Sequence, residues 1–161
     1  MSRPDSGWRL SLDQSSKNTL NNSNHADGSL PLVCICGGSA SGKTHFLNGL
    51  VRQLESIGLS ALPLHCDNYY RSRYKPDPIA GFDTINAIDT EALLDDLQAA
   101  RERTLTHLRR YDMSSRVVVY RPIGERCLTA GYDLIVVEGA YGPQAILPRV
   151  LIDVVVYLDK E

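Results

Sequence analysis

The sequence of 161 residues contains no uninterrupted apolar run of the ~18 residues that a membrane-spanning helix requires. Its first residues also lack the apolar stretch of a signal peptide. The formal net charge is only -2, which argues against binding to nucleic acid or to a membrane surface through bulk electrostatics. We therefore expect a cytoplasmic protein with no nucleic acid and no membrane among its partners.

Cysteines are few, and none of the four forms a C-x-x-C pair or has the spacing of a metal site. Three of them, Cys34, Cys36 and Cys66, fall in stretches that we predict to be strands, where buried free thiols are common. We expect free thiols in a reducing compartment. The alternative is a disulfide between two of the four.

The composition of the chain changes near residue 30. Residues 1–29 are rich in Ser and Asn and have little apolar periodicity, which is typical of a disordered polar tail. Residues 30–161 are long enough to form one domain with a real hydrophobic core. We therefore predict a tail at 1–29 and a single domain at 30–161.

A glycine-rich stretch, "GGSASGKT", fits the pattern G-x-x-x-x-G-K-[ST] at Gly37–Thr44. Before it stands the apolar run Leu30–Cys36, which is typical of a strand that is covered on both faces. After it, apolar residues recur every three or four positions up to Gly58, which predicts a half-buried helix that ends at this glycine. A strand, a loop and a helix in this order are the context that a phosphate-binding loop requires.

Each part of this loop has an expected task. Small residues and the helix N-terminus would present backbone N–H groups to phosphate oxygens, Lys43 would bind the β- and γ-phosphates, and the Thr44 hydroxyl would ligate Mg²⁺. The alternative is a Gly/Ser-rich turn that caps an ordinary helix. The predicted nucleotide-binding residues are Gly37, Gly38, Ser39, Ala40, Ser41, Gly42, Lys43 and Thr44.

From residue 30 onward, predicted strands and helices alternate along the chain, which indicates an α/β fold. We expect a P-loop NTPase-type, mostly parallel sheet with helices on both faces. The predicted elements after the first helix are a strand at 61–66, a polar loop, a helix from Asp89 or Thr90 to about 105, a strand at 116–120 with a nearby β partner, buried strands at 133–139 and 152–159, and a short helix at 143–150.

Acidic residues follow two of the predicted strands. Asp67 comes directly after the strand at 61–66, and Glu138 ends the apolar run "LIVV". Ligands of such folds bind outside the carboxyl ends of the strands, and phosphoryl transfer requires a metal ion and a carboxylate near the acceptor hydroxyl. Each acid has an alternative role, which is to finish a buried strand in solvent, and we prefer that role for Asp153 and Asp159.

Five segments in one order resemble the uridine kinase and phosphoribulokinase group of P-loop kinases. They are "GGSASGKT", "CDNYY", "GFDTINAID", "RYDMSS" and "VVEGAY", within residues 32–160. The resemblance implies Asp67 as the catalytic base and a metal-associated acid, with Lys43 in the catalytic set. It implies Glu138 as an Mg²⁺-associated acid.

On the acceptor side, the resemblance implies that Tyr70 contacts the substrate, that Asp83 holds a ribose, and that Tyr111 lies against a base. The tyrosines could instead cover apolar surface, and Asp83 could cap a turn. The implied function is an ATP- and Mg²⁺-dependent small-molecule kinase that phosphorylates the 5′-hydroxyl of a uridine- or cytidine-like nucleoside. The alternatives are a sugar phosphate or vitamin precursor as acceptor, or a nucleotide-binding module without turnover. The sequence leaves the oligomeric state open, with a homo-oligomer as one alternative.

The sequence departs from this family at two places. Arg116 stands about where the family has a base-reading histidine, and we expect it to contact a base carbonyl, a phosphate or a carboxylate of the acceptor. The alternative is a solvated arginine at the start of a strand. The chain stops at "YLDKE", whereas family members continue into an arginine-rich lid helix. We expect a fragment, a member without its lid, or a site that another chain completes. We expect a solvated face for Arg101, Arg103, Arg109 and Arg110.

Overall fold

The structure, a computed structural model, describes residues 30–123, 131–146 and 152–159. The predicted tail at 1–29, Cys127 and the second half of the expected helix at 143–150 lie outside these residues. Among the residues that are described, no helix combines the length and the apolar composition that crossing a bilayer requires.

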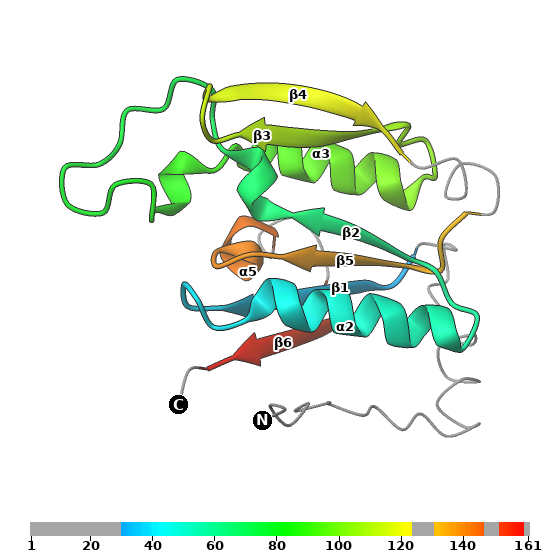
Figure 1. Ribbon diagram of the computed structural model, residues 1–161. Coiled ribbons are helices and arrows are strands. Elements are labelled where there is room, and N and C mark those ends of the chain that lie inside the picture. The colour runs from blue at the N-terminus through cyan, green and yellow to red at the C-terminus, as the bar shows by residue number, and fades with distance from the viewer. Residues whose placement is uncertain (1–29, 124–130, 147–151, 160–161) are drawn as a thin grey trace, which may run out of the picture.

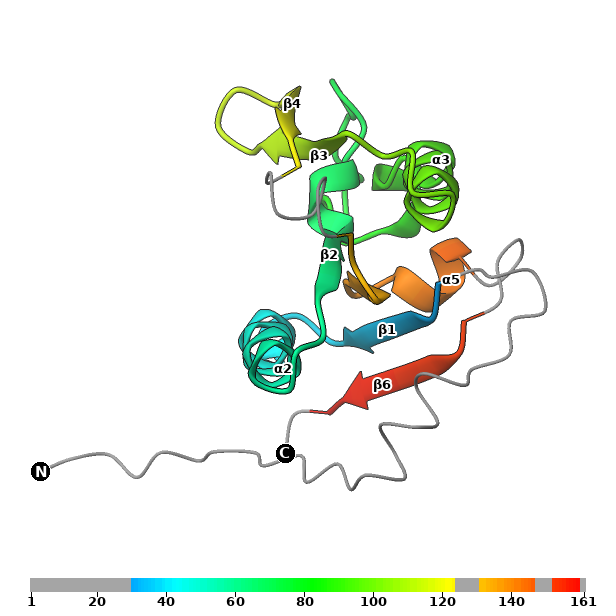
Figure 2. The same cartoon turned by 90° about the vertical axis from the view of Figure 1, so that its right-hand side faces the viewer.

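A four-stranded parallel sheet forms the centre of the molecule, with the strand order β2-β5-β1-β6. Its strands are β1 (Leu32–Gly37), β2 (Ala61–His65), β5 (Leu134–Glu138) and β6 (Val154–Leu158). Helix α2 (Lys43–Ser56) covers one face, while α3 (Thr90–Arg101) and the short α5 (Gly142–Ile146) lie on the other. Figures 1 and 2 show this arrangement from two directions, and it confirms the predicted fold class.

The sheet separates two apolar cores. Leu47 and Leu54 of α2 pack with Ile35 of β1 on one side. On the other side Leu93 and Leu97 of α3 belong to a larger core that includes α5 and the inner strands. Because β1 and β5 bury side chains on both faces, their sequences are almost continuously apolar.

The predicted boundary signals of the helices are confirmed. Gly58 has φ +84°, and the N–H groups of Gly58 and Leu59 bond to the carbonyls of Glu55 and Leu54, which ends α2 in a Schellman motif. Asp89 caps α3 through its side chain, which accepts a hydrogen bond from the N–H of Ala92. Helix α3 ends at Arg101, four residues earlier than the sequence predicted.

The prediction that the last strand is buried is wrong. Val154, Val155 and Tyr157 of β6 are 50%, 48% and 67% exposed. Within the described residues β6 pairs only with β1 and lies at the edge of the sheet. A run of valines predicts a strand, but it does not show whether that strand lies at the centre or at the edge of the sheet.

A separate antiparallel hairpin lies above the sheet (Figure 1). It consists of β3 (His107–Asp112) and β4 (Val117–Pro122), so the expected β partner of the strand near 116–120 is residues 107–112. The turn is held by the Asp112 carboxylate, which accepts hydrogen bonds from Ser114 and Ser115. Arg116 closes the turn with φ +56°, and its N–H bonds to the carbonyl of Asp112.

The prediction of a solvated Arg109 is also wrong. Its side chain is 8% exposed, and it donates to the Asp89 carboxylate at 3.2 Å and to the backbone carbonyl of Tyr70 at 3.4 Å. Its guanidinium carbon also lies 5.6 Å from the centre of the Tyr69 ring. Arg109 therefore joins the hairpin to the N-terminus of α3 and to the segment that follows β2. The neighbouring Arg110 is exposed, as expected.

We expect Arg109→Met to lower the free energy of unfolding by about 2 kcal/mol, because hydrogen bonds to charged groups contribute on this scale and the substitution leaves Asp89 without this partner. Urea unfolding followed by circular dichroism measures the change. Arg110→Met in the same strand is the matched control, with an expected change within ~0.5 kcal/mol. Equal stability of the two variants would contradict the assigned role of Arg109.

Candidate functional site

The loop Gly37–Thr44 connects β1 to α2 at the carboxyl end of the sheet. Gly42 has φ +84°, a left-handed conformation that suits glycine, and its carbonyl accepts the N–H of Phe46 to begin the helix. Gly37 is required for another reason, because a Cβ at this position would collide with the backbone carbonyl of Leu158 in β6. The side chain of Lys43 folds back over the loop, and its ammonium donates to the carbonyl of Gly38 at 2.6 Å.

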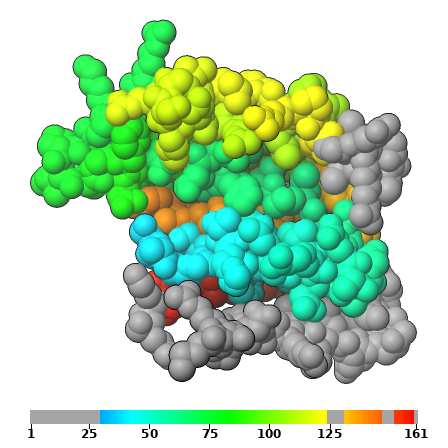
Figure 3. Space-filling model, viewed as in Figure 1, coloured from blue at the N-terminus to red at the C-terminus, as the bar shows by residue number. Residues whose placement is uncertain are grey.

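A cavity of about 400 Å³ opens next to this loop. Figure 3 shows the orange surface of the β5–α5 region between α2 in cyan and the green segment that follows β2. The predicted residues that line the cavity are Ser39, Ala40, Gly42, Lys43, Thr44, Asp67, Tyr70, Asp83 and Glu138. The predicted residues that do not line it are Gly37, Gly38, Ser41, Tyr111 and Arg116. The structure thus brings the glycine-rich loop and the acids Asp67 and Glu138 together with Tyr70 and Asp83.

Two carboxylates enter the cavity from neighbouring parallel strands. Glu138 is the last residue of β5 and pairs in register with His65 of β2, and Asp67 follows two residues later in a 3₁₀ turn (Cys66–Tyr69). Asp67 is exposed by its overall solvent-accessible area, but surrounding atoms partly desolvate its carboxyl group. This desolvation raises the pKa of Asp67 above its ordinary value, the charge of Glu138 raises it further, and Lys43 and His65 act in the opposite direction.

The oxygen atoms in the cavity suit a hard divalent cation. The Thr44 hydroxyl and the carboxylates of Asp67 and Glu138 all line it, and Mg²⁺ prefers such ligands. Among the described residues there is no cluster of three or more His, Cys, Asp or Glu side chains that could hold a metal ion alone. Mg²⁺ commonly keeps several waters and binds through one or two carboxylates together with substrate phosphates, so these residues fit it.

An aromatic cluster lies beside the acids. The ring of Tyr70 is 5.5 Å from that of Tyr111 and 5.7 Å from that of Phe82. Partial burial raises the pKa of Tyr70 to about 12, and the nearby charges of Asp67 and Asp83 act in the same direction. Tyr111 is 6% exposed, so it supports Tyr70 from behind and does not line the cavity itself.

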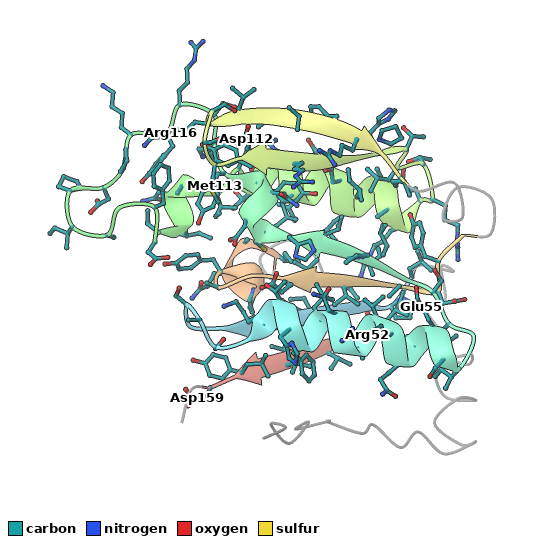
Figure 4. All side chains as sticks on the ribbon, in the orientation of Figure 1. Arg52, Glu55, Asp112, Met113, Arg116 and Asp159 are labelled. Atoms are coloured by element: carbon teal, nitrogen blue, oxygen red, sulfur yellow. The ribbon has the colours of Figure 1, made fainter. Side chains whose placement is uncertain are left out.

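Arg116 does not line the cavity that contains the acids. Its guanidinium carbon is 5.3 Å from the centre of the Phe82 ring. Figure 4 shows it at the turn of the hairpin, with Asp112 and Met113. It lines a second cavity with the segment around Arg73 and Lys75. Its contact with Phe82, whose ring packs against the cavity residue Tyr70, links it to the first cavity.

The sequence assigned no role to several residues at the cavity. Phe82 packs between Arg116 and the cavity residue Tyr70, and the cavity is also lined by His45, Cys66, Ile88, Ala140 and Tyr141. Some of these positions did contain a signal, since His45 follows the loop threonine directly and Phe82 precedes Asp83. Tyr141 stands three residues after Glu138 in "VVEGAY". Aromatic residues next to motif positions are therefore the sequence signal for these parts of the cavity.

No family model matches the chain. Two curated relatives, both named uridine kinase, come from Macrococcus caseolyticus strain JCSC5402 and Staphylococcus haemolyticus strain JCSC1435. Each is 27% identical over 139 residues, which are 81% of this chain and 62% of the relative. The chain therefore spans less than two thirds of the length of the curated relatives that it matches.

Two solved structures resemble this chain in fold, and one of them also resembles it in sequence. The structure of a "Possible Uridine Kinase" from Bacillus stearothermophilus superposes with a TM-score of 0.65 and 27% identity, covering 83% of this chain and 72% of that one. A second structure is that of a protein from Silicibacter sp. TM1040 named "putative fructose transport system kinase". It superposes with a TM-score of 0.56 and 17% identity, covering 78% of this chain and 61% of that one. At this identity it supports the fold alone. Together, the ordered motifs, the fold and these relatives show that the chain is similar to proteins named uridine kinase, and they support its resemblance to the uridine kinase and phosphoribulokinase group of P-loop kinases.

Proposed function

We propose that this protein binds Mg²⁺·ATP at Gly37–Thr44 and transfers the γ-phosphoryl group to a hydroxyl of a small molecule. One observation supports this most strongly, namely that Asp67 and Glu138 share a cavity with Lys43 and Thr44. Phosphoryl transfer depends mainly on positioning and on charge stabilisation, and this cavity combines a cation, carboxylates and a loop of backbone N–H groups.

The donor side would be formed by the loop and the acids. Lys43 would exchange its bond to the Gly38 carbonyl for bonds to phosphate oxygens, so the charge is already held over the loop before ATP binds. Thr44, Asp67 and Glu138 would hold Mg²⁺. The metal ion, when it is bound, neutralises negative charge on the phosphates.

The acceptor side would be formed by Asp67, Tyr70 and Asp83. A raised pKa makes the Asp67 carboxylate a better proton acceptor for the attacking hydroxyl. Asp83 would accept hydrogen bonds from acceptor hydroxyls such as those of a ribose. The adjacent rings of Tyr70 and Phe82 provide apolar surface against which a planar base can pack.

The proposed acceptor is a uridine- or cytidine-like nucleoside, phosphorylated at its 5′-hydroxyl. The names of the curated relatives and the aromatic surface beside Asp83 support this choice. The second candidate is an anionic acceptor such as a sugar phosphate. It is favoured by Arg116, which supplies a guanidinium beside Phe82 and suits anions and carbonyl oxygens.

We expect Lys43→Ala to abolish binding of the terminal phosphates of ATP without unfolding the domain. The lysine is only half-buried, so its loss leaves no core cavity. Isothermal calorimetry with ATP measures the affinity, and circular dichroism checks the fold. Lys75→Ala is the control, because Lys75 lies on the segment away from this cavity. Unchanged ATP affinity in Lys43→Ala would exclude the proposed phosphate site.

We expect Asp67→Asn to keep nucleotide binding but to lose ~10²–10⁴-fold in turnover, because asparagine cannot accept the hydroxyl proton. The assay follows ADP formation with a panel of nucleosides and sugar phosphates. The unaltered protein must first show ADP formation that depends on the acceptor. If it binds ATP without such turnover, it is a nucleotide-binding module and not a kinase. If Asp67→Asn turns over normally, Asp83 becomes the next candidate for the base.

We expect Arg116→His to change the order of preference among acceptors and to leave ATP affinity unchanged. A guanidinium only donates hydrogen bonds, whereas a neutral imidazole can also accept one. In the same panel, uridine and cytidine should gain relative to anionic acceptors. An unaltered rank order would show that Arg116 does not read the acceptor.

A further inference from the structure

The proposed function does not account for His65, although this residue contacts one of its acids. The Nδ1 atom of His65 lies 2.9 Å from Oε2 of Glu138, and the side chains of the two residues are 34% and 7% exposed. Since a carboxylate has no proton to give, the imidazole N–H is the donor in this hydrogen bond. Glu138 therefore has one of its two oxygens bound by a neighbouring strand.

This contact is not needed to hold the two strands together. Strands β2 and β5 are already joined by a parallel ladder of five residue pairs, from Ala61 opposite Leu134 to His65 opposite Glu138. The pair stands at the last position of this ladder, at the end of the sheet where the cavity opens. Its position favours a role in the cavity.

We propose that His65 is a positioning residue for the metal site, which holds Oε2 of Glu138 and leaves Oε1 to Mg²⁺. This inference rests on the proposed function. A carboxylate that is free to rotate presents its oxygens in many directions, and a hydrogen bond to one oxygen restricts that rotation. Partners of this kind commonly contribute 10–100-fold to metal affinity.

The charge around the pair is consistent with this role. His65 and Lys43 both act to lower the pKa of Asp67, against the effects of desolvation and of Glu138. The imidazole therefore lies near both acids that would share the metal. No other partner of the Glu138 carboxylate is seen in the described part of the chain, so His65 is the group that orients it.

The test compares His65→Leu with His65→Asn. Leucine removes the donor, whereas the Nδ2 atom of asparagine stands at the same position along the side chain as Nδ1 of histidine. Calorimetry measures ATP affinity with Mg²⁺ and with EDTA, and Mn²⁺ binding in the presence of ADP is followed by electron paramagnetic resonance. His107→Leu is the matched control, because His107 is exposed on β3 and its side chain hydrogen-bonds with the neighbouring Thr106, far in sequence from the acids of the cavity.

We expect His65→Leu to lose about 10–100-fold of the Mg²⁺-dependent gain in ATP affinity and of Mn²⁺ affinity. Affinity in EDTA should not change. His65→Asn should retain most of the metal-dependent affinity that His65→Leu loses, and His107→Leu should behave like the unaltered protein. His65→Ala serves as a second variant without a donor if His65→Leu does not fold.

Three results would overturn the proposal. An equal loss of ATP affinity with and without metal would assign His65 a purely structural role, and an asparagine variant as weak as the leucine variant would exclude the hydrogen bond. A leucine variant with unchanged metal dependence would exclude any role in the metal site. If the unaltered protein itself binds ATP without a metal effect, or does not bind ATP, the proposed function fails first, so the two failures can be distinguished.

Discussion

The parallel pairing of β5 with β2 on one side and β1 on the other is the constraint on which the site depends. In this register Glu138 stands opposite both Ile35 and His65. The loop that follows β1 and the turn that follows β2 therefore leave the sheet on either side of Glu138. No single segment could place Lys43, Asp67 and Glu138 around one cavity, and a shift of one residue in either pairing would turn Glu138 to the opposite face.

Two carboxylates close together at the carboxyl ends of β2 and β5 have an electrostatic cost, which the fold only partly offsets. Glu138 is buried, and its charge together with desolvation raises the pKa of Asp67. His65 and Lys43 supply partial compensation from β2 and from the loop. A cavity with two nearby carboxylates attracts a cation, since buried charges require pairing. The same feature that weakens the empty fold therefore favours a bound cation, which is what the proposed function requires.

A hairpin outside the central sheet packs against the segment that carries Tyr70, one of the proposed acceptor residues. Arg109 connects this hairpin to α3 and to the Tyr70 backbone, and the N–H of Tyr111 bonds to the side chain of Asn68. These contacts attach the hairpin next to the turn that carries Asp67. Arg116 and the loop Gly37–Thr44 thus belong to different elements, so Arg116 can differ from the resembling family while the loop keeps the family's pattern.

The sequence by itself determined the features that depend on neighbours along the chain. These are the loop between β1 and α2, the end of α2 at Gly58, the N-terminal cap of α3, and the acids at the ends of β2 and β5. Only the tertiary structure decided that β6 is exposed, that Arg109 is buried, that His65 meets Glu138, and that Phe82 stands between Arg116 and the cavity. The physical reason is that periodicity and capping are local, whereas burial and side-chain pairing depend on which strands become neighbours in the sheet.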